Sequence, residues 1–209
     1  MPSRPPAIRR VSSLIAFAGA ALWTAAAWAT PQKSPGQPPA ARAQVTVVVG
    51  GLDHPWSMAF LPGGGVLITE RPGHLRLLRT PGGLSKPLAG VPKVAAQGQG
   101  GLLDVALSPD FARDRYVYLS YAESDGSRSG TAVGRGRLSA DAGALEDFQV
   151  LFRQAPKLSQ GQHFGSRLVF DGKGHLFISL GENNQRPTAQ DLDKLQGKVV
   201  RLAPDGSVP

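Results

Sequence analysis

The sequence contains no cysteine among its 209 residues. This absence excludes a disulfide framework, a thiolate metal site and a thiol nucleophile. The stability of the folded chain must therefore come from an ordinary hydrophobic core. Apolar residues make up 41% of the chain and glycine contributes 26 residues, a composition typical of sheets joined by tight turns.

The sequence also has no segment in which positive charge is concentrated. It contains 23 Lys and Arg against 15 Asp and Glu, a net charge of +8. The basic residues are scattered, with no basic helix and no aromatic platform between them, which argues against nucleic-acid binding. A moderately basic surface would still suit a small anionic ligand. No His, Asp and Glu residues have the spacing of a metal site, and no EF-hand loop occurs.

The segment Met1–Ala29 has the pattern of a secretory signal peptide. Three arginines precede a mostly apolar run, Val11–Trp28, and Ala27-Trp28-Ala29 gives the small-x-small motif of a cleavage site. An uncleaved membrane anchor is the alternative, because the run approaches the roughly 20 residues that span a bilayer. Cleavage would leave twenty basic against fifteen acidic residues, a net charge of +5, in a periplasmic or secreted protein.

Residues Thr30–Ala43 are rich in proline, glutamine and alanine and predict a disordered linker. From residue 44 to residue 209 the chain predicts an all-β domain, because short apolar runs alternate with turns of proline, aspartate and glycine. One helical turn is expected at Asp191–Gln196. The expected strands are Gln44–Val49, Trp56–Phe60, Val66–Glu70, Leu75–Arg79, Leu102–Leu107, Tyr116–Tyr121, Arg167–Phe170, Leu176–Leu180 and Lys198–Leu202.

The order of these elements repeats along the chain. Ala59-Phe60, Ala106-Leu107 and Val169-Phe170 occupy equivalent places, as do His74 and His175, which are therefore expected to be structural. Separations of roughly 40–60 residues between four-stranded units predict the blades of a β-propeller. With about three and a half blades, the chain is expected to be the N-terminal part of a longer protein. A small half-propeller that dimerises is the alternative.

The segment Lys157–Asn184 holds the candidate site. It places His163 before one apolar run, a tight turn at Asp171–Gly174 and a second run, Leu176–Leu180, which is followed by Glu182. Two strands joined by this turn would bring His163 and Glu182 to the same end of a small sheet. An imidazole is largely neutral at pH 7 and can accept a proton, so His163 is a candidate general base. A loop or turn-capping histidine is the alternative from the residues alone.

Three longer motifs resemble one known family. They are QGQGGLLDVALSPDF at Gln97–Phe111, GLDHPWSMAFLPGGGVLITERPGHLRLL at Gly51–Leu78, and the run His163–Leu202. All three are similar to the soluble glucose/sorbosone dehydrogenases, quinoproteins built on a six-bladed β-propeller with pyrroloquinoline quinone (PQQ). The third motif is most similar to the periplasmic aldose dehydrogenase branch. The resemblance covers nearly all of Val45–Pro209.

The resemblance implies PQQ-dependent oxidation of aldose sugars at C1 to the lactone. His163 matches the family histidine that takes the proton of the anomeric hydroxyl while the hydride passes to the quinone. Gln99 matches a glutamine that hydrogen-bonds quinone and substrate oxygens, and Glu182 matches an acidic residue of the substrate pocket. Gln162 stands where the glucose-oxidising branch commonly has an aspartate, which favours a substrate-binding role and a broad aldose specificity.

The resemblance also implies Ca²⁺, which activates PQQ and holds the structure. Its ligands, and the cations that clamp the PQQ carboxylates, are expected beyond Pro209, so the isolated 209 residues are expected to be inactive. The implied partners are an aldose and an electron acceptor, with no nucleic acid and no membrane anchor after signal cleavage. From the residues alone, Gln99 could instead be a turn residue, and Glu182 could instead be a solvated carboxylate in a loop. A propeller lactonase and a non-catalytic sugar- or peptide-binding propeller remain alternatives.

Overall fold

The computed structural model describes residues 43–79, 81–159 and 161–209. The predicted signal peptide and all of the predicted linker except its last residue lie outside these ranges. Within them, no helix has the length and apolar character needed to cross a membrane. Residues Thr46–Pro209 form one compact unit.

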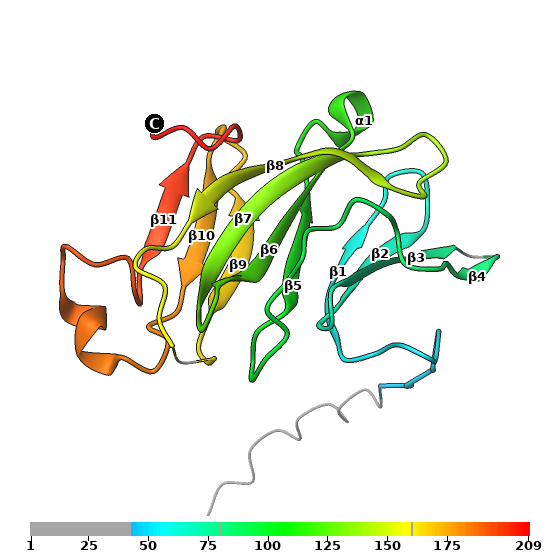
Figure 1. The fold of residues 1–209 in the computed structure, drawn as a ribbon. Coiled ribbons are helices and arrows are strands. Elements are labelled where there is room, and N and C mark those ends of the chain that lie inside the picture. The colour runs from blue at the N-terminus through cyan, green and yellow to red at the C-terminus, as the bar shows by residue number, and fades with distance from the viewer. Residues whose placement is uncertain (1–42, 80, 160) are drawn as a thin grey trace, which may run out of the picture. The chain divides into compact units, whose positions relative to one another are not determined.

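Three antiparallel sheets make up this unit (Figure 1). The first contains β1 (Pro55–Phe60), β2 (Val66–Glu70), β3 (His74–Arg79) and β4 (Gly83–Leu84). The second contains β5 (Leu102–Leu107), β6 (Tyr116–Asp125), β7 (Arg128–Leu138) and β8 (Leu145–Arg153). The third contains β9 (Gly165–Phe170), β10 (Leu176–Leu180) and β11 (Val199–Leu202). Two short helices, α1 (Phe111–Asp114) and η1 (Arg186–Gln190), lie between strands.

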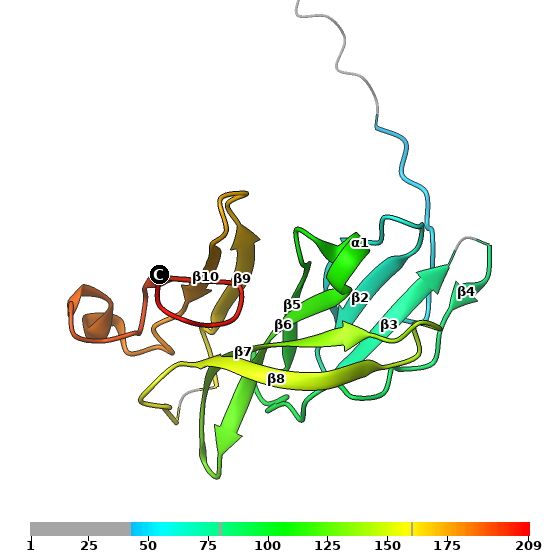
Figure 2. The same cartoon turned by 90° about the horizontal axis from the view of Figure 1, so that it is seen from above.

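The arrangement of the sheets confirms the prediction of an all-β partial propeller. Within each sheet, strands that follow one another in sequence pair side by side. The first strands of the three sheets lie against one another, because β5 contacts β1 and also β9. Viewed from above, the second sheet lies between the other two (Figure 2). Two sheets have four strands and the third has three. The described residues thus form two four-stranded blades and one three-stranded blade, whereas about three and a half blades were expected.

The hydrophobic core lies between adjacent sheets. One cluster joins the first two sheets through leucines such as Leu75 on β3 and Leu119 on β6, both 0% exposed. A second cluster joins the second and third sheets through Tyr118, Leu176 and Ile178. Complete burial of each such side chain stabilises the fold by about 1.5–3 kcal/mol. Neighbouring sheets are therefore held together by apolar contacts that neither could make alone.

Two predicted elements are wrong. Gln44–Val49 forms no strand, although its residues are β-branched, because no described strand lies beside it to complete a ladder. Val47 and Val48 are accordingly 83% and 73% exposed. The helical turn lies at η1 rather than at Asp191–Gln196, because Pro187 favours a helix start and Asp191 is extended, with φ −76° and ψ 119°.

Candidate functional site

A cavity of about 400 Å³ opens where the inner strands β1, β5 and β9 begin. The first strand of each sheet runs away from this end, so the loops that enter the three sheets converge here. The sequence order of the strands therefore brings residues from three distant segments into one wall. The lining residues are Trp56, Arg71, Gly98, Gln99, Leu103, His163, Phe164 and Gly165.

His163 enters the cavity from the loop before β9. Its φ of 49° is in the left-handed region, which is uncommon for a residue other than glycine. Two neighbours hold its backbone: its N–H donates to Gln99 Oε1 at 3.0 Å, and its carbonyl accepts the Asn183 N–H at 3.3 Å. Backbone strain that is held in place by surrounding contacts is common at functional sites.

Glu182 lies directly beside the His163 imidazole. The pairing of β9 with β10 places Gly165 opposite Leu180, so the residues flanking the hairpin meet at one end, as the sequence predicted. Glu182 Oε1 is 2.6 Å from His163 Nδ1. The hydrogen bond from His163 lowers the pKa of Glu182, which keeps the carboxylate ionised. An ionised carboxylate can only accept, so Nδ1 carries the proton of this contact.

Gln99 reaches His163 from the loop before β5. The Gln99 N–H donates to the Gly161 carbonyl at 2.8 Å, which ties this loop to the loop that carries His163. Gly98, with φ 59°, allows this approach, because a Cβ there would lie 2.3 Å from the Gly161 oxygen. The amide oxygen of Gln99 is occupied by the His163 N–H. Its amide nitrogen remains as the donor that Gln99 can offer to a ligand.

The side chain of Gln162 does not line the cavity. Gln162 is exposed and is not among the lining residues. Its backbone carbonyl accepts a hydrogen bond from Asn183 Nδ2 at 3.0 Å. Asn183 itself is 1% exposed, and its buried Oδ1 has no hydrogen-bond partner among the described residues. The structure thus brings together His163, Gln99 and Glu182 and leaves the Gln162 side chain outside this group.

Sequence reasoning did not single out Trp56 or Arg71, which complete the cavity wall from the first sheet. Arg167, on β9, lies 5.2 Å above the Trp56 ring, and its Nη1 is 2.8 Å from Asp104 Oδ1. Trp56 and Arg71 fall within the motif Gly51–Leu78, but that motif does not indicate which of its side chains turn toward the cavity. Trp56 and Arg71 line the cavity only because the first sheet packs beside the loops that precede β5 and β9.

No metal site is formed by the described part of the chain, which contains no group of three or more His, Asp or Glu side chains placed to hold an ion. The cavity lining itself includes one guanidinium and no carboxylate. Its chemistry, with cationic, amide and imidazole groups beside an indole ring, suits an oxygen-rich or anionic ligand better than a cation.

Three blade-like sheets with a ligand-sized cavity at the mouth of their inner strands define a β-propeller binding or catalytic protein. The family described as Glucose / Sorbosone dehydrogenase matches residues 52–209. The chain therefore belongs to the glucose/sorbosone dehydrogenase family.

Individual relatives agree with this assignment. The aldose sugar dehydrogenase YliI of Escherichia coli (strain K12) is 59% identical over 188 residues, 89% of this chain and 48% of that protein. The crystal structure of the apo form of the soluble aldose sugar dehydrogenase from Escherichia coli matches with a TM-score of 0.74 and 65% identity, over 76% of this chain and 46% of that one.

A PQQ-bound aldose sugar dehydrogenase from Streptomyces coelicolor matches with a TM-score of 0.68 and 32% identity, over 78% of this chain and 48% of that one. The chain thus spans about half the length of these relatives.

Proposed function

We propose that this chain supplies the first blades of a PQQ-dependent dehydrogenase that oxidises aldose sugars at C1 to the lactone. The observation that carries the proposal is the contact between His163 and Glu182 at the cavity where Gln99 also lies. The names of the relatives support the substrate class, since all three are aldose sugar dehydrogenases and one of them was solved with PQQ bound.

The cavity fits the cofactor in its chemistry. PQQ is a flat ortho-quinone with three carboxylates, and the lining offers a guanidinium, an amide and an imidazole, while Glu182, which is not among the lining residues, is bonded to that imidazole. When bound, PQQ supplies the acceptor for the C1 hydride. The residues of this chain that would hold it are Gln99 and others of the cavity wall.

His163 is the general base of the proposed reaction. Because Nδ1 donates to the ionised Glu182, Nε2 carries the lone pair that takes the proton of the anomeric hydroxyl. Glu182 then stabilises the imidazolium that forms. Gln99 is held by two hydrogen bonds: its N–H donates to the Gly161 carbonyl, and its Oε1 accepts the His163 N–H. These bonds fix the position of the Gln99 amide relative to the base.

The remaining expectations belong to the same proposal. The protein acts in the periplasm or outside the cell after removal of Met1–Ala29, and Ca²⁺ binds through ligands beyond Pro209. The substrate range is broad among aldoses, because Gln162 cannot act as a second carboxylate beside the base. The isolated 209 residues are proposed to be inactive, because they span only about half the length of the relatives.

The test uses the full-length parent protein, prepared without cofactor and then loaded with PQQ and Ca²⁺. Several aldoses are assayed by the reduction of an artificial electron dye. His163→Ala should lower the rate by roughly 10²–10⁴-fold, the usual contribution of a positioned base. His54→Ala, at an exposed histidine whose ring pairs with Asp53, is the matched control and should retain activity. Normal turnover by His163→Ala, or no sugar oxidation by the loaded wild type, would refute the proposal.

A further inference from the structure

Arg71 is the one cationic residue that lines the cavity, and the lining residues include no carboxylate; the nearby Glu182 carboxylate is bonded to His163. Among the described residues, Arg71 belongs to no ion pair. A guanidinium cannot lose its proton in a protein, so the charge is permanent. An unpaired guanidinium beside a cavity is a binding site for an anion.

The backbone of Arg71 is fixed on both sides. Its N–H donates to the His54 carbonyl at 3.0 Å, and its carbonyl accepts the Leu102 N–H at 3.0 Å. Gly101 makes this second contact possible, because a Cβ there would lie 2.0 Å from the Arg71 carbonyl oxygen. Arg71 therefore joins the end of β2 to the start of β5, and its position does not depend on a ligand.

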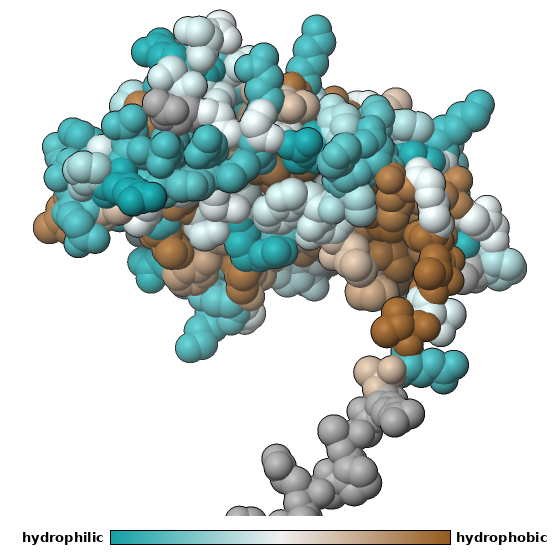
Figure 3. Space-filling view, turned by 90° about the horizontal axis from the view of Figure 1, so that it is seen from below, coloured by the Kyte–Doolittle hydropathy of each residue, from teal (hydrophilic) through white to brown (hydrophobic). Residues whose placement is uncertain are grey.

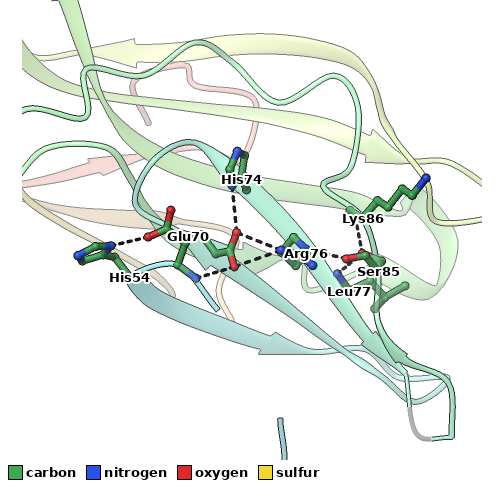
Figure 4. A network of polar contacts seen from close by, with 8 residues as sticks. His54, Glu70, His74, Arg76, Leu77, Ser85 and Lys86 are labelled. Atoms are coloured by element: carbon green, nitrogen blue, oxygen red, sulfur yellow. Dashed lines mark hydrogen bonds and ion pairs between the residues drawn. The ribbon is translucent and has the colours of Figure 1, made fainter. Parts of the chain in front are cut away.

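The preceding residue, Glu70, does not compensate the charge of Arg71. Glu70 is 0% exposed, and its carboxylate is already bound by other groups (Figure 4). It accepts the Asp53 N–H at 2.9 Å and contacts His74 Nδ1 at 3.1 Å and Arg76 Nη1 at 3.4 Å. This network anchors the strand end from which Arg71 leaves toward the cavity.

The guanidinium also touches the loop that carries Gln99. Arg71 Nη1 donates to the carbonyl of Gly98, and Gln99, the next residue, accepts the His163 N–H at 3.0 Å. One of the five N–H donors of the guanidinium is thus used to hold the loop. The others remain to form the paired hydrogen bonds that a carboxylate accepts.

We infer that Arg71 binds a carboxylate of the quinone cofactor and, through Gly98, positions Gln99 against His163. The inference rests on the proposed function, which supplies a ligand with three carboxylates. An aldose carries none, so the charge of Arg71 discriminates between cofactor and substrate. Arg71 is then a cofactor-binding residue contributed by the first blade, in addition to the cations expected beyond Pro209.

The experiment measures ligand binding rather than turnover. The cofactor-free full-length parent protein is titrated with PQQ and with the uncharged trimethyl ester of PQQ, and binding is followed by calorimetry. Arg71→Gln removes the charge, and Arg71→Lys keeps it without the planar pair of donors. Arg113→Gln, at an arginine 82% exposed in a surface pair with Asp110, controls for the loss of one positive charge.

Arg71→Gln should weaken PQQ binding by about 10- to 100-fold, the range for a lost charge-assisted contact. Binding of the ester by Arg71→Gln should change far less, so the preference of this variant for the triacid over the ester should fall. The preference shown by Arg71→Lys should lie between those of the wild type and Arg71→Gln. Retained ester binding also shows that the variant is folded. An unchanged preference in Arg71→Gln would overturn this inference alone. Failure of the wild type to bind either ligand would overturn it together with the proposed function.

Discussion

The backbone of His163 is left-handed, and its carbonyl is closely enclosed. Gly181 lies against that carbonyl, so that a Cβ at residue 181 would be 1.5 Å from the His163 oxygen. Glycine at this position is required by space alone, since Gly181 does not have a positive φ. The conformation of the proposed base therefore depends on a residue that has no functional group.

Gly181→Ala should destabilise the full-length parent protein by about 1–3 kcal/mol, the usual cost of forcing an extra group into a packed site. It should also reduce activity by displacing His163. Gly63→Ala is the control, because a Cβ at residue 63 would have no atom within 4 Å. Urea unfolding of the two variants measures the difference. Equal stability of Gly181→Ala and Gly63→Ala would contradict the close packing described.

The pKa of Glu182 is lowered by its hydrogen bond with His163, so the native state favours the ionised carboxylate. A lowered native pKa contributes stability that is fully present above the unfolded value of about 4.3. That contribution is lost as the pH falls through the lower native pKa.

The stability advantage of wild type over Glu182→Gln should accordingly be constant from pH 7 to about pH 5 and shrink below about pH 4.3. Urea unfolding at a series of pH values measures it. Glu146→Gln, at an exposed strand carboxylate with no ion pair among the described residues, controls for the loss of one negative charge. An advantage that grows as the pH falls from 4.3 would show that the sign of the Glu182 shift is wrong.

At the level of elements, one buried carboxylate links all three sheets. Asp104 on β5 accepts from Ser57 Oγ on β1 at 2.5 Å, from Arg167 Nη1 on β9 at 2.8 Å and from the Leu168 N–H at 2.7 Å. Its side chain is 2% exposed. The inner strands are thus joined by hydrogen bonds to a single side chain as well as by apolar contacts.

Asp104→Ala should destabilise the full-length parent protein by about 3–5 kcal/mol, because it leaves buried donors on two strands without an acceptor. Ser57→Ala, which removes one of the donors to the same carboxylate, should cost only about 1 kcal/mol. Chemical denaturation compares the two. A loss below 1 kcal/mol for Asp104→Ala would mean that the three sheets are held by apolar packing alone.

Regular alternation and clear turns made some elements predictable. The bounds of β2, β5 and β10 agree with the expected runs, since each is a short apolar segment between strong turn residues. β7 and β8 were not predicted, because glycines and arginines interrupt the apolar pattern of β7 and the acidic pair Glu146-Asp147 interrupts that of β8. Both strands pair with their neighbours in sequence, but these pairings depend on side-chain packing across the sheet, which the sequence of one strand does not show.

Some residues of the site could likewise be predicted from the sequence, and others could not. The two flanks of one hairpin, His163 and Glu182, could be placed together from the turn between them. Arg71 and Trp56 could not, since they meet His163 through contacts across roughly a hundred residues. The repeat-equivalent histidines were expected to be structural, and each lies beside a carboxylate four residues earlier: His74 beside Glu70 and His175 beside Asp171.

At the scale of the whole molecule, the two outer sheets each leave an apolar face uncovered. On β1, Met58 and Phe60 are 61% and 73% exposed, beside a groove of about 390 Å³. Apolar side chains gather over this part of the surface (Figure 3). On the third sheet, Val169 and Val199 are 52% and 67% exposed. Blades of a propeller cover such faces with their neighbours.

The isolated 209-residue chain should therefore self-associate at micromolar concentration, and Met58→Lys with Phe60→Ser should reduce this, as measured by light scattering. The same pair should destabilise the full-length parent protein, in which a further blade is proposed to cover β1. Leu192→Ser, at a 97% exposed residue outside the sheets, is the control. Full-length protein unaffected by the double substitution would contradict a buried β1 face.

The cavity lies at the seams where β1, β5 and β9 begin, so its walls are also the points at which neighbouring sheets could part. A molecule bound there would bridge those seams and oppose their local opening. Amide hydrogen exchange near Leu102 and Gly165 would then slow on binding, while the distant β7–β8 edge would exchange as before. In this architecture, a ligand that fills the site also holds the blades together.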